Sequence, residues 1–221
     1  MYLKLFITKF IMDLVCIDLD NTLIDSDKPH ILGYLNAFKK NNLPYKSPKE
    51  IKKYFGLVSS EIIKNLYPKI SKNKLNKVLE DNYNYFYKHR HQLKAFKGIK
   101  KTLKILSKKY TLALISNCPK KQVLDSVKKT KINLKLFKLV IGCDQVKKPK
   151  PYPDEILLAE KILNKKAKFV IGDSPYDIIA GKKAHTKTIA VLTGNHSKKD
   201  LKKTNPDFIF SNFNQVLKVL K

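Results

Sequence analysis

An apolar run passes directly into acidic residues in the stretch Leu14-Val15-Cys16-Ile17-Asp18-Leu19-Asp20-Asn21-Thr22-Leu23. A short apolar run of this kind is typical of a buried parallel strand, and open α/β sheets bind ligands beyond the carboxyl ends of such strands. Asp18 and Asp20 lie at that exit. Ionising two carboxylates so close together is costly unless they share a proton or a cation. Because hard divalent cations prefer carboxylate and carbonyl oxygens, the pair predicts a metal site.

The same arrangement recurs downstream, where three more apolar runs end in polar residues. They are 111–115 before Ser116-Asn117, 139–142 before Asp144 and Lys148, and 168–171 before Gly172-Asp173-Ser174 and Asp177. Between and beside these runs the spacing of apolar residues predicts helices over 99–108, 120–129, 153–163 and 177–184. Alternation of strands and helices predicts a parallel sheet with right-handed crossovers. We therefore expect an α/β fold with a Rossmann-like parallel sheet whose polar strand ends meet along one edge.

These motifs, in this order, resemble the haloacid dehalogenase-like hydrolase superfamily. The resemblance is carried over nearly the whole chain by Asp18-x-Asp20-x-Thr22, Ser116-Asn117, Lys148 and Gly172-Asp173-Ser174-x-x-Asp177. Residues 148–153 and a tail with Gly194 and 205–209 are similar to its phosphoglycolate-phosphatase-like branch. Asn21 stands where many relatives carry glycine, and asparagine tolerates the left-handed backbone that a tight turn needs.

The resemblance implies a division of labour among these residues. Asp18 would attack phosphorus and form an aspartyl-phosphate, which splits one difficult step into two easier ones. Asp20 would protonate the leaving oxygen and then activate water. Ser116 would donate its hydroxyl to a phosphoryl oxygen, Lys148 would neutralise negative charge, and Asn117 would orient one of them. Lys148 is preferred over its lysine neighbours because it directly precedes a proline, as in the resembling family.

Mg²⁺ is the cofactor that the resemblance implies. This ion keeps several waters and needs only one or two protein carboxylates, which suits Asp18 and Asp173, with the backbone carbonyl of Asp20 as a further ligand. Asp177 and Thr22 are expected behind these ligands, Asp177 in contact directly or through water, and Thr22 is also expected to cap the turn. Taken singly, these motifs also suit an Asx turn, a helix N-cap and an acidic helix start. Their convergence on one edge favours the functional interpretation.

The length of 221 residues allows a core domain with an insertion. We expect residues 12–24 and 96–221 to form the core and 25–95 to form an inserted α-helical cap, because apolar residues in that stretch recur at helical spacing. The loop at 54–61 either faces the active site or packs beneath it. Residues 1–11 are expected to be a non-native or loosely attached extension, with translation beginning at Met12.

A formal net charge of +28 invites a nucleic-acid hypothesis. However, Arg90 is the one arginine among 46 basic residues, and the lysines are spread along the chain. Arginine is the preferred contact for bases and phosphates, so we expect no specific nucleic-acid partner. An odd count of three cysteines without metal-ligand spacing suits a reduced, cytoplasmic protein. No membrane association is expected, and the oligomeric state is expected to be a monomer or homodimer.

The sequence thus predicts a Mg²⁺-dependent phosphatase that hydrolyses a small phosphorylated metabolite, with phosphoglycolate as the first guess. A pyrophosphatase, a nucleotidase or a sugar phosphomutase would use the same core. From another class, a non-catalytic basic RNA-binding or interaction protein could have inherited the fold. The joint presence of Asp18, Asp20, Lys148 and Asp173 disfavours that alternative.

Overall fold

Six parallel strands form the sheet of the computed structural model, which describes residues 12–220. The expected extension at 1–11 lies outside the described residues. In spatial order the strands are β5 (Phe137–Gly142), β4 (Thr111–Ser116), β1 (Leu14–Asp18), β6 (Ala167–Gly172), β7 (Lys187–Val191) and β8 (Phe208–Phe210). Because β1 pairs with β4 on one side and β6 on the other, Asp18 ends a strand with neighbours on both sides.

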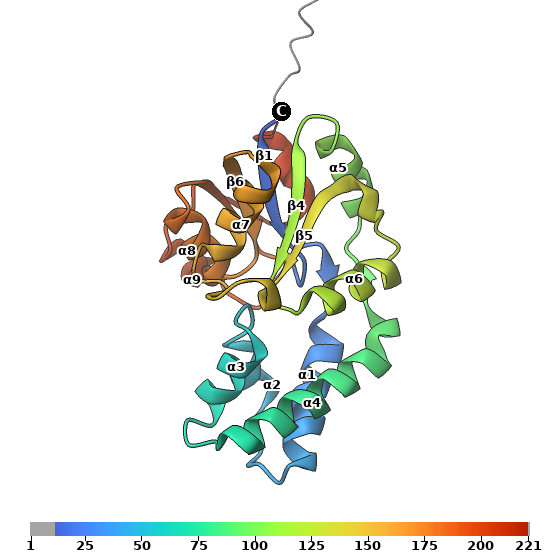
Figure 1. Cartoon of the computed structure of the whole chain (residues 1–221), viewed down its shortest axis with the longest axis vertical. Helices are drawn as coiled ribbons and strands as arrows, with labels where there is room; N and C mark the ends of the chain where they lie inside the picture. Colours follow the sequence, from blue (N-terminus) through green and yellow to red (C-terminus); the bar gives the residue numbers. More distant parts are fainter. Residues whose placement is uncertain (1–11, 221) are drawn as a thin grey trace, which may run out of the picture.

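Helices cover both faces of the sheet (Figure 1). One face packs through Val15 and Ile17 against α5 (Ile99–Leu106), α6 (Lys120–Lys129) and the 3₁₀ helix η4 (Phe213–Lys218). The other packs through Leu14 and Cys16 against α7 (Asp154–Leu163) and α8 (Pro175–Lys183). Burial on both faces explains why these strands are apolar throughout instead of alternating. The predicted fold class is confirmed.

Short elements complete the chain around this sheet. They are α9 (Lys198–Lys202) and the 3₁₀ helices η1 (Arg90–Gln92), η2 (Leu134–Leu136) and η3 (Cys143–Gln145). Asp144, which follows β5, accepts a hydrogen bond from the backbone of Lys120 at 2.8 Å, at the start of α6. Asp144 therefore accepts a hydrogen bond from the first turn of α6 near the sheet edge.

Residues 27–89 form four helices with their own apolar cluster: α1 (Asp27–Lys40), α2 (Pro48–Lys52), α3 (Ser59–Leu66) and α4 (Lys72–His89). Ser47 and Glu50 form a capping box that begins α2, and Ser71 accepts a backbone hydrogen bond that begins α4. The chain enters and leaves this segment through a short antiparallel pair, β2 (Ile24–Asp25) and β3 (Lys94–Ala95). In Figure 1 the strands of the sheet run down toward these four helices.

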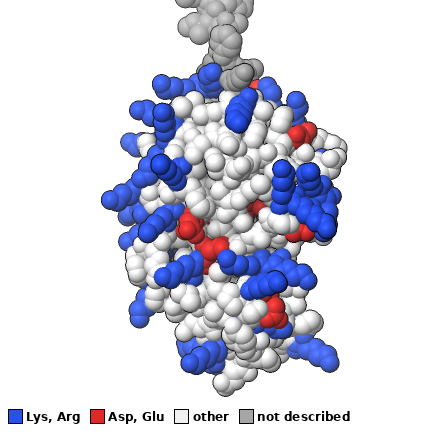
Figure 2. Space-filling model, turned by 180° about the vertical axis from the view of Figure 1, so that it is seen from behind, with Lys and Arg blue, Asp and Glu red and all other residues white. Residues whose placement is uncertain are grey.

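Basic side chains lie over both the sheet region and the helical segment on the face seen in Figure 2. Acidic side chains are interspersed among them, so this face carries no single basic stripe. Across residues 12–220, no helix combines the length and the apolar character needed to cross a lipid bilayer.

Candidate active site

Asp18 ends β1 at the sheet edge, where the residue is 6% exposed. Leu19 accepts backbone hydrogen bonds from Leu23 and Ile24, which folds the chain back directly after the strand. Asn21 sits in this turn with φ of 57°, the left-handed conformation that asparagine tolerates. The turn therefore survives without the glycine that many relatives carry.

Lys150, and not Lys148, reaches this site, which corrects the sequence prediction. The Lys150 ammonium donates to Asp18 Oδ1 and to Asp177 Oδ1, each at 2.7 Å, and the residue is 3% exposed. Lys148 is exposed, and its ammonium lies 5.2 Å from the centre of the Tyr152 ring. Both lysines precede a proline, so that feature could not separate them. Lys150 is nearer in sequence to the start of α7, and at this residue the chain is buried.

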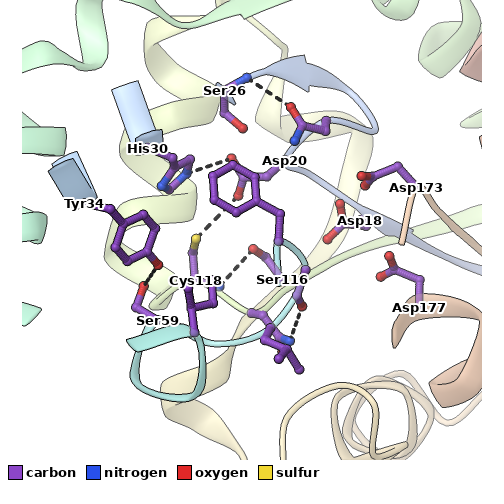
Figure 3. Close-up of a pocket in the computed structure, with 16 residues that line it drawn as sticks. Asp18, Asp20, Ser26, His30, Tyr34, Ser59, Ser116, Cys118, Asp173 and Asp177 are labelled. Atoms are coloured by element: carbon purple, nitrogen blue, oxygen red, sulfur yellow. Dashed lines mark hydrogen bonds and ion pairs between the residues drawn. The ribbon is translucent and has the colours of Figure 1, made fainter. Parts of the chain in front are cut away.

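Asp173 follows β6 and lies close to Asp18 (Figure 3). Its Oδ1 accepts a hydrogen bond from the Thr22 hydroxyl at 2.9 Å, across 151 residues of sequence. This contact agrees with the predicted place of Thr22 behind the metal ligands, and its hydroxyl contacts Asp173 and not its own turn. A Cβ at Gly194 would lie 1.8 Å from Asp173 Oδ2, so only glycine leaves room for this carboxylate.

Asp177 uses both of its oxygens to organise the site. Oδ2 accepts hydrogen bonds from the Ser174 backbone at 3.1 Å and hydroxyl at 2.6 Å, which begins α8. Oδ1 receives the Lys150 ammonium. Asp177 thus links Lys150 to the start of α8. This is consistent with the prediction that Asp177 lies behind the metal ligands.

Three buried carboxylates meet here with one lysine among them. Asp18, Asp173 and Asp177 each offer an oxygen within 4.8 Å of the others. Burial raises the pKa of Asp18 to about 8 against the opposing charge of Lys150, and burial with the neighbouring Asp18 raises the pKa of Asp173 well above its usual value. A divalent cation would stabilise the ionised forms, and carboxylates are the ligands it prefers. The donor set therefore fits Mg²⁺.

Ser116 and Asn117 leave β4 at the same edge. The Ser116 hydroxyl is buried and accepts a hydrogen bond from the Cys118 backbone at 3.1 Å. The Asn117 amide donates to the backbone carbonyls of Lys150, at 2.8 Å, and Gly56, at 2.6 Å. Asn117 therefore fixes the lysine segment and also contacts the loop before α3.

Asp20 points away from the other carboxylates, toward His30 of α1 and Cys118 (Figure 3). Its Oδ1 lies 3.5 Å from His30 Nε2, and its Oδ2 accepts a hydrogen bond from the Cys118 thiol at 3.4 Å. Burial acts to raise the pKa of Asp20, but His30, Ser26 and Cys118 together outweigh it and lower that pKa. Sequence analysis missed His30, because a lone histidine in a helical pattern carries no signal for its spatial neighbour.

A cavity of about 60 Å³ lies between the sheet edge and the helical segment. Its polar wall includes Asp18, Asp20, Ser116, Asn117 and Asp173. Its other wall comes largely from the helical segment and includes His30, Tyr34, Phe55, Gly56, Leu57, Ser59 and Ile62. The loop predicted at 54–61 therefore faces the site. Neither lysine nor arginine occurs among the described residues that line this cavity.

The structure thus brings the predicted site residues together along one edge, with Lys148 as the exception. The set that meets there is Asp18, Asp20, Thr22, Ser116, Asn117, Asp173 and Asp177. The structure adds Lys150 and His30 to the residues that the sequence predicted for this site.

Comparisons with known proteins agree with this geometry. The model of the haloacid dehalogenase-like hydrolase family matches residues 15–191. A phosphoglycolate phosphatase of Aquifex aeolicus is 32% identical over 221 residues, covering 95% of this chain and 97% of that protein. A pyrophosphatase PpaX of Listeria welshimeri is 28% identical, covering 92% of this chain and 94% of that protein.

Solved structures show the same fold at lower identity. A hydrolase from Pseudomonas syringae has a TM-score of 0.86 at 21% identity, covering 95% of this chain and 97% of the other. A haloacid dehalogenase-like family protein from Streptococcus pneumoniae has a TM-score of 0.82 at 21% identity, covering 95% and 99%. With the family model spanning most of the chain and motifs that meet at one sheet edge, this chain belongs to the haloacid dehalogenase-like hydrolase family.

Proposed function

We propose that this protein is a Mg²⁺-dependent phosphatase that hydrolyses a small phosphate monoester through an aspartyl-phosphate on Asp18. The observation that carries the proposal is the buried group of Asp18, Asp173 and Asp177 around Lys150, at the wall of a small cavity. A site that is negative overall needs a cation before it can accept a phosphate. The similarity to a phosphoglycolate phosphatase and a pyrophosphatase supports the same class of reaction.

Asp18 is placed to act as the nucleophile. It ends the central strand, its carboxylate faces the cavity, and Lys150 holds one of its oxygens at 2.7 Å. Attack by the other oxygen on phosphorus would form the aspartyl-phosphate and release the leaving oxygen. Lys150 and the Ser116 hydroxyl would then stabilise the negative charge that grows on the phosphoryl oxygens.

Asp20 would act as the general acid and then as the general base. Its carboxylate lies at the cavity wall, two residues after the nucleophile, where it can protonate a leaving oxygen and later take a proton from water. His30 is a positioning residue for this carboxylate, because its ring stacks on Phe86 at 4.3 Å and faces Asp20 from the helical segment.

Mg²⁺ would be held by Asp18, Asp173 and the backbone carbonyl of Asp20. When bound, it would supply positive charge that offsets the carboxylates and polarises a phosphoryl oxygen. Thr22 would orient Asp173 toward it, since hydrogen bonds to a ligand's second oxygen fix its direction. Asp177 would keep Lys150 in place.

The helical segment, residues 25–95 in the sequence prediction, would serve as a cap that excludes water and selects the substrate. Two contacts support this role: the Gly56 carbonyl accepts from Asn117, and the Phe55 carbonyl contacts His196 Nε2 at 2.8 Å. Both join the cap loop to the sheet edge.

All three cysteines are free, which suits a reducing compartment. We propose a cytoplasmic protein that acts as a monomer or homodimer.

The cavity favours a substrate with a small leaving group. A volume of about 60 Å³ holds a few water-sized groups, since one water needs about 10–15 Å³ by this measure. That space suits phosphoglycolate or pyrophosphate better than a nucleotide or a sugar phosphate. Phosphoglycolate therefore remains the first candidate substrate. Pyrophosphate is the second, because one similar protein is named a pyrophosphatase.

The proposal is tested by measuring phosphate release from phosphoglycolate, pyrophosphate, a nucleoside monophosphate and a hexose phosphate. With Mg²⁺, we expect kcat/KM for phosphoglycolate or pyrophosphate to exceed that for the nucleotide by at least about tenfold, because a small pocket disfavours larger groups. EDTA should abolish release and added Mg²⁺ should restore it. Release that is indifferent to EDTA would contradict the metal role. Binding of RNA without any phosphate release would support the non-catalytic alternative instead.

A further inference from the structure

We propose that Asp20, His30 and Cys118 form a second metal site that takes Zn²⁺ or a similarly borderline-soft cation. Each residue offers one ligand atom, and the three atoms lie within 4.8 Å of one another. This group is separate from the carboxylates that would hold Mg²⁺, because the Asp20 side chain turns away from them (Figure 3).

The contacts of Asp20 are close to those of a zinc site. Tetrahedral zinc with nitrogen, oxygen and sulfur ligands places the ligand atoms about 3.3–3.7 Å apart, given its usual bond lengths. His30 Nε2 lies 3.5 Å from Asp20 Oδ1, and Cys118 Sγ lies 3.4 Å from the other oxygen, Oδ2, while all three residues offer ligand atoms within 4.8 Å of one another. Small side-chain rotations would therefore complete the arrangement.

Two of the atoms that face this point are buried and make no hydrogen bond of normal geometry. They are His30 Nε2 and Asp20 Oδ1, which form only a long contact of 3.5 Å with each other. Buried polar atoms normally make closer contacts, so both atoms remain available to a shared ligand. The His30 ring is held in place by stacking on Phe86, so its nitrogen is already oriented toward that ligand.

The donor types select against Mg²⁺ at this point. Magnesium favours oxygen ligands, whereas a thiolate, an imidazole and a carboxylate together favour zinc. On binding, the Cys118 thiol releases its proton to solvent, and the two anionic ligands then balance the dication. Three protein ligands leave a fourth position, which opens toward the cavity that all three residues line.

The three ligands come from both parts of the molecule. Asp20 follows β1 and Cys118 follows β4, while His30 belongs to α1 of the helical segment. A bound zinc ion would therefore tie the segment to the sheet edge. If the proposed function holds, it would also occupy the general acid, so zinc would inhibit hydrolysis in a manner that excess Mg²⁺ does not reverse.

The direct test is a Co²⁺ titration of the full chain in saturating Mg²⁺, followed by absorbance. We expect a thiolate-to-cobalt charge-transfer band in the near ultraviolet, together with the visible absorption bands of tetrahedral cobalt. Both sets of bands should disappear when Zn²⁺ displaces the cobalt. Cys118→Ala should lose the thiolate band and bind Zn²⁺ at least about tenfold more weakly. Removing a residue that only hydrogen-bonds to a metal ligand already lowers metal affinity by about that factor. If Cys118→Ala fails to fold, Cys118→Ser serves for the same comparison.

Cys143→Ala is the matched control. Cys143 is also half-buried and its backbone amide donates to the Cys118 carbonyl at 3.1 Å, but its thiol is not part of the group. This variant should keep the full cobalt spectrum. Asp18→Asn should also keep it while losing hydrolysis, so failure of the proposed phosphatase would leave the metal test intact. The proposal is overturned if wild type shows no thiolate band, if Cys118→Ala retains it, or if Mg²⁺ displaces the cobalt.

Discussion

Asp18→Asn is expected to lower kcat by at least about 10⁴-fold on whichever ester the protein hydrolyses, the scale seen when an essential catalytic group is removed. The amide keeps the shape of the carboxylate but has no anionic oxygen to attack phosphorus. Because Lys150 keeps its ion pair with Asp177 in this variant, and one of three crowded carboxylates is neutralised, we expect the fold to persist. Steady-state phosphate release measures the first effect, and a denaturation midpoint checks the second.

Asp13→Asn is the matched control for this variant. Asp13 lies just before the amino end of the same strand, where its carboxylate pairs with Lys168 at 2.6 Å and is about half exposed. The chemical change is identical, but the site is at the opposite end of β1. Activity should stay close to that of wild type. Equal losses in the two variants would show that Asp18 acts through the strand's structure and not through chemistry.

Lys150→Met should weaken both folding and hydrolysis. The ammonium is buried between Asp18 and Asp177, and those charges raise the pKa of Lys150 well above its usual value in spite of burial. Removing one partner of a buried ion pair costs about 3–5 kcal/mol in the free energy of unfolding. Loss of its charge next to the phosphoryl group should cost about 10²–10³-fold in kcat. Urea denaturation without Mg²⁺ and initial rates with Mg²⁺ measure the two effects.

Lys148→Met separates the two lysines that precede a proline. Lys148 is exposed and its ammonium lies over the Tyr152 ring, so its loss should change the free energy of unfolding by less than about 0.5 kcal/mol and leave kcat nearly unchanged. Added Mg²⁺ should restore part of the stability lost in Lys150→Met, because a cation again compensates Asp18 and Asp177. If Lys148→Met were the more damaging variant, the assignment of Lys150 would be wrong.

The sheet could be predicted from the sequence because its inner strands are buried on both faces. Burial on two sides makes each strand a continuous apolar run, as at β1, β4 and β6. The sequence prediction does not include β7 and β8, the last two strands on one side of the sheet. β8 has only three residues, all half-buried, which is too short a run to stand out.

The site could be predicted wherever a residue ends a strand or directly follows one. Asp18, Ser116 and Asp173 are fixed by that rule, since parallel strands deliver their ends to one edge. Lys150 and His30 obey no such rule. Lys150 lies in a loop eight residues beyond β5, and His30 reaches Asp20 only because the start of α1 lies beside the turn after β1. Their places depend on tertiary packing, which neither periodicity nor local spacing encodes.

The most direct measurement is to locate the phosphoryl group during turnover. Rapid quenching in acid with substrate and Mg²⁺, followed by peptide mapping by mass spectrometry, should find one phosphoryl group on the peptide that contains Asp18. The signal should appear within the first turnover and be absent from Asp18→Asn. A phosphoryl group on His30 or another residue, or multiple turnovers with no phosphorylated peptide, would contradict hydrolysis through Asp18.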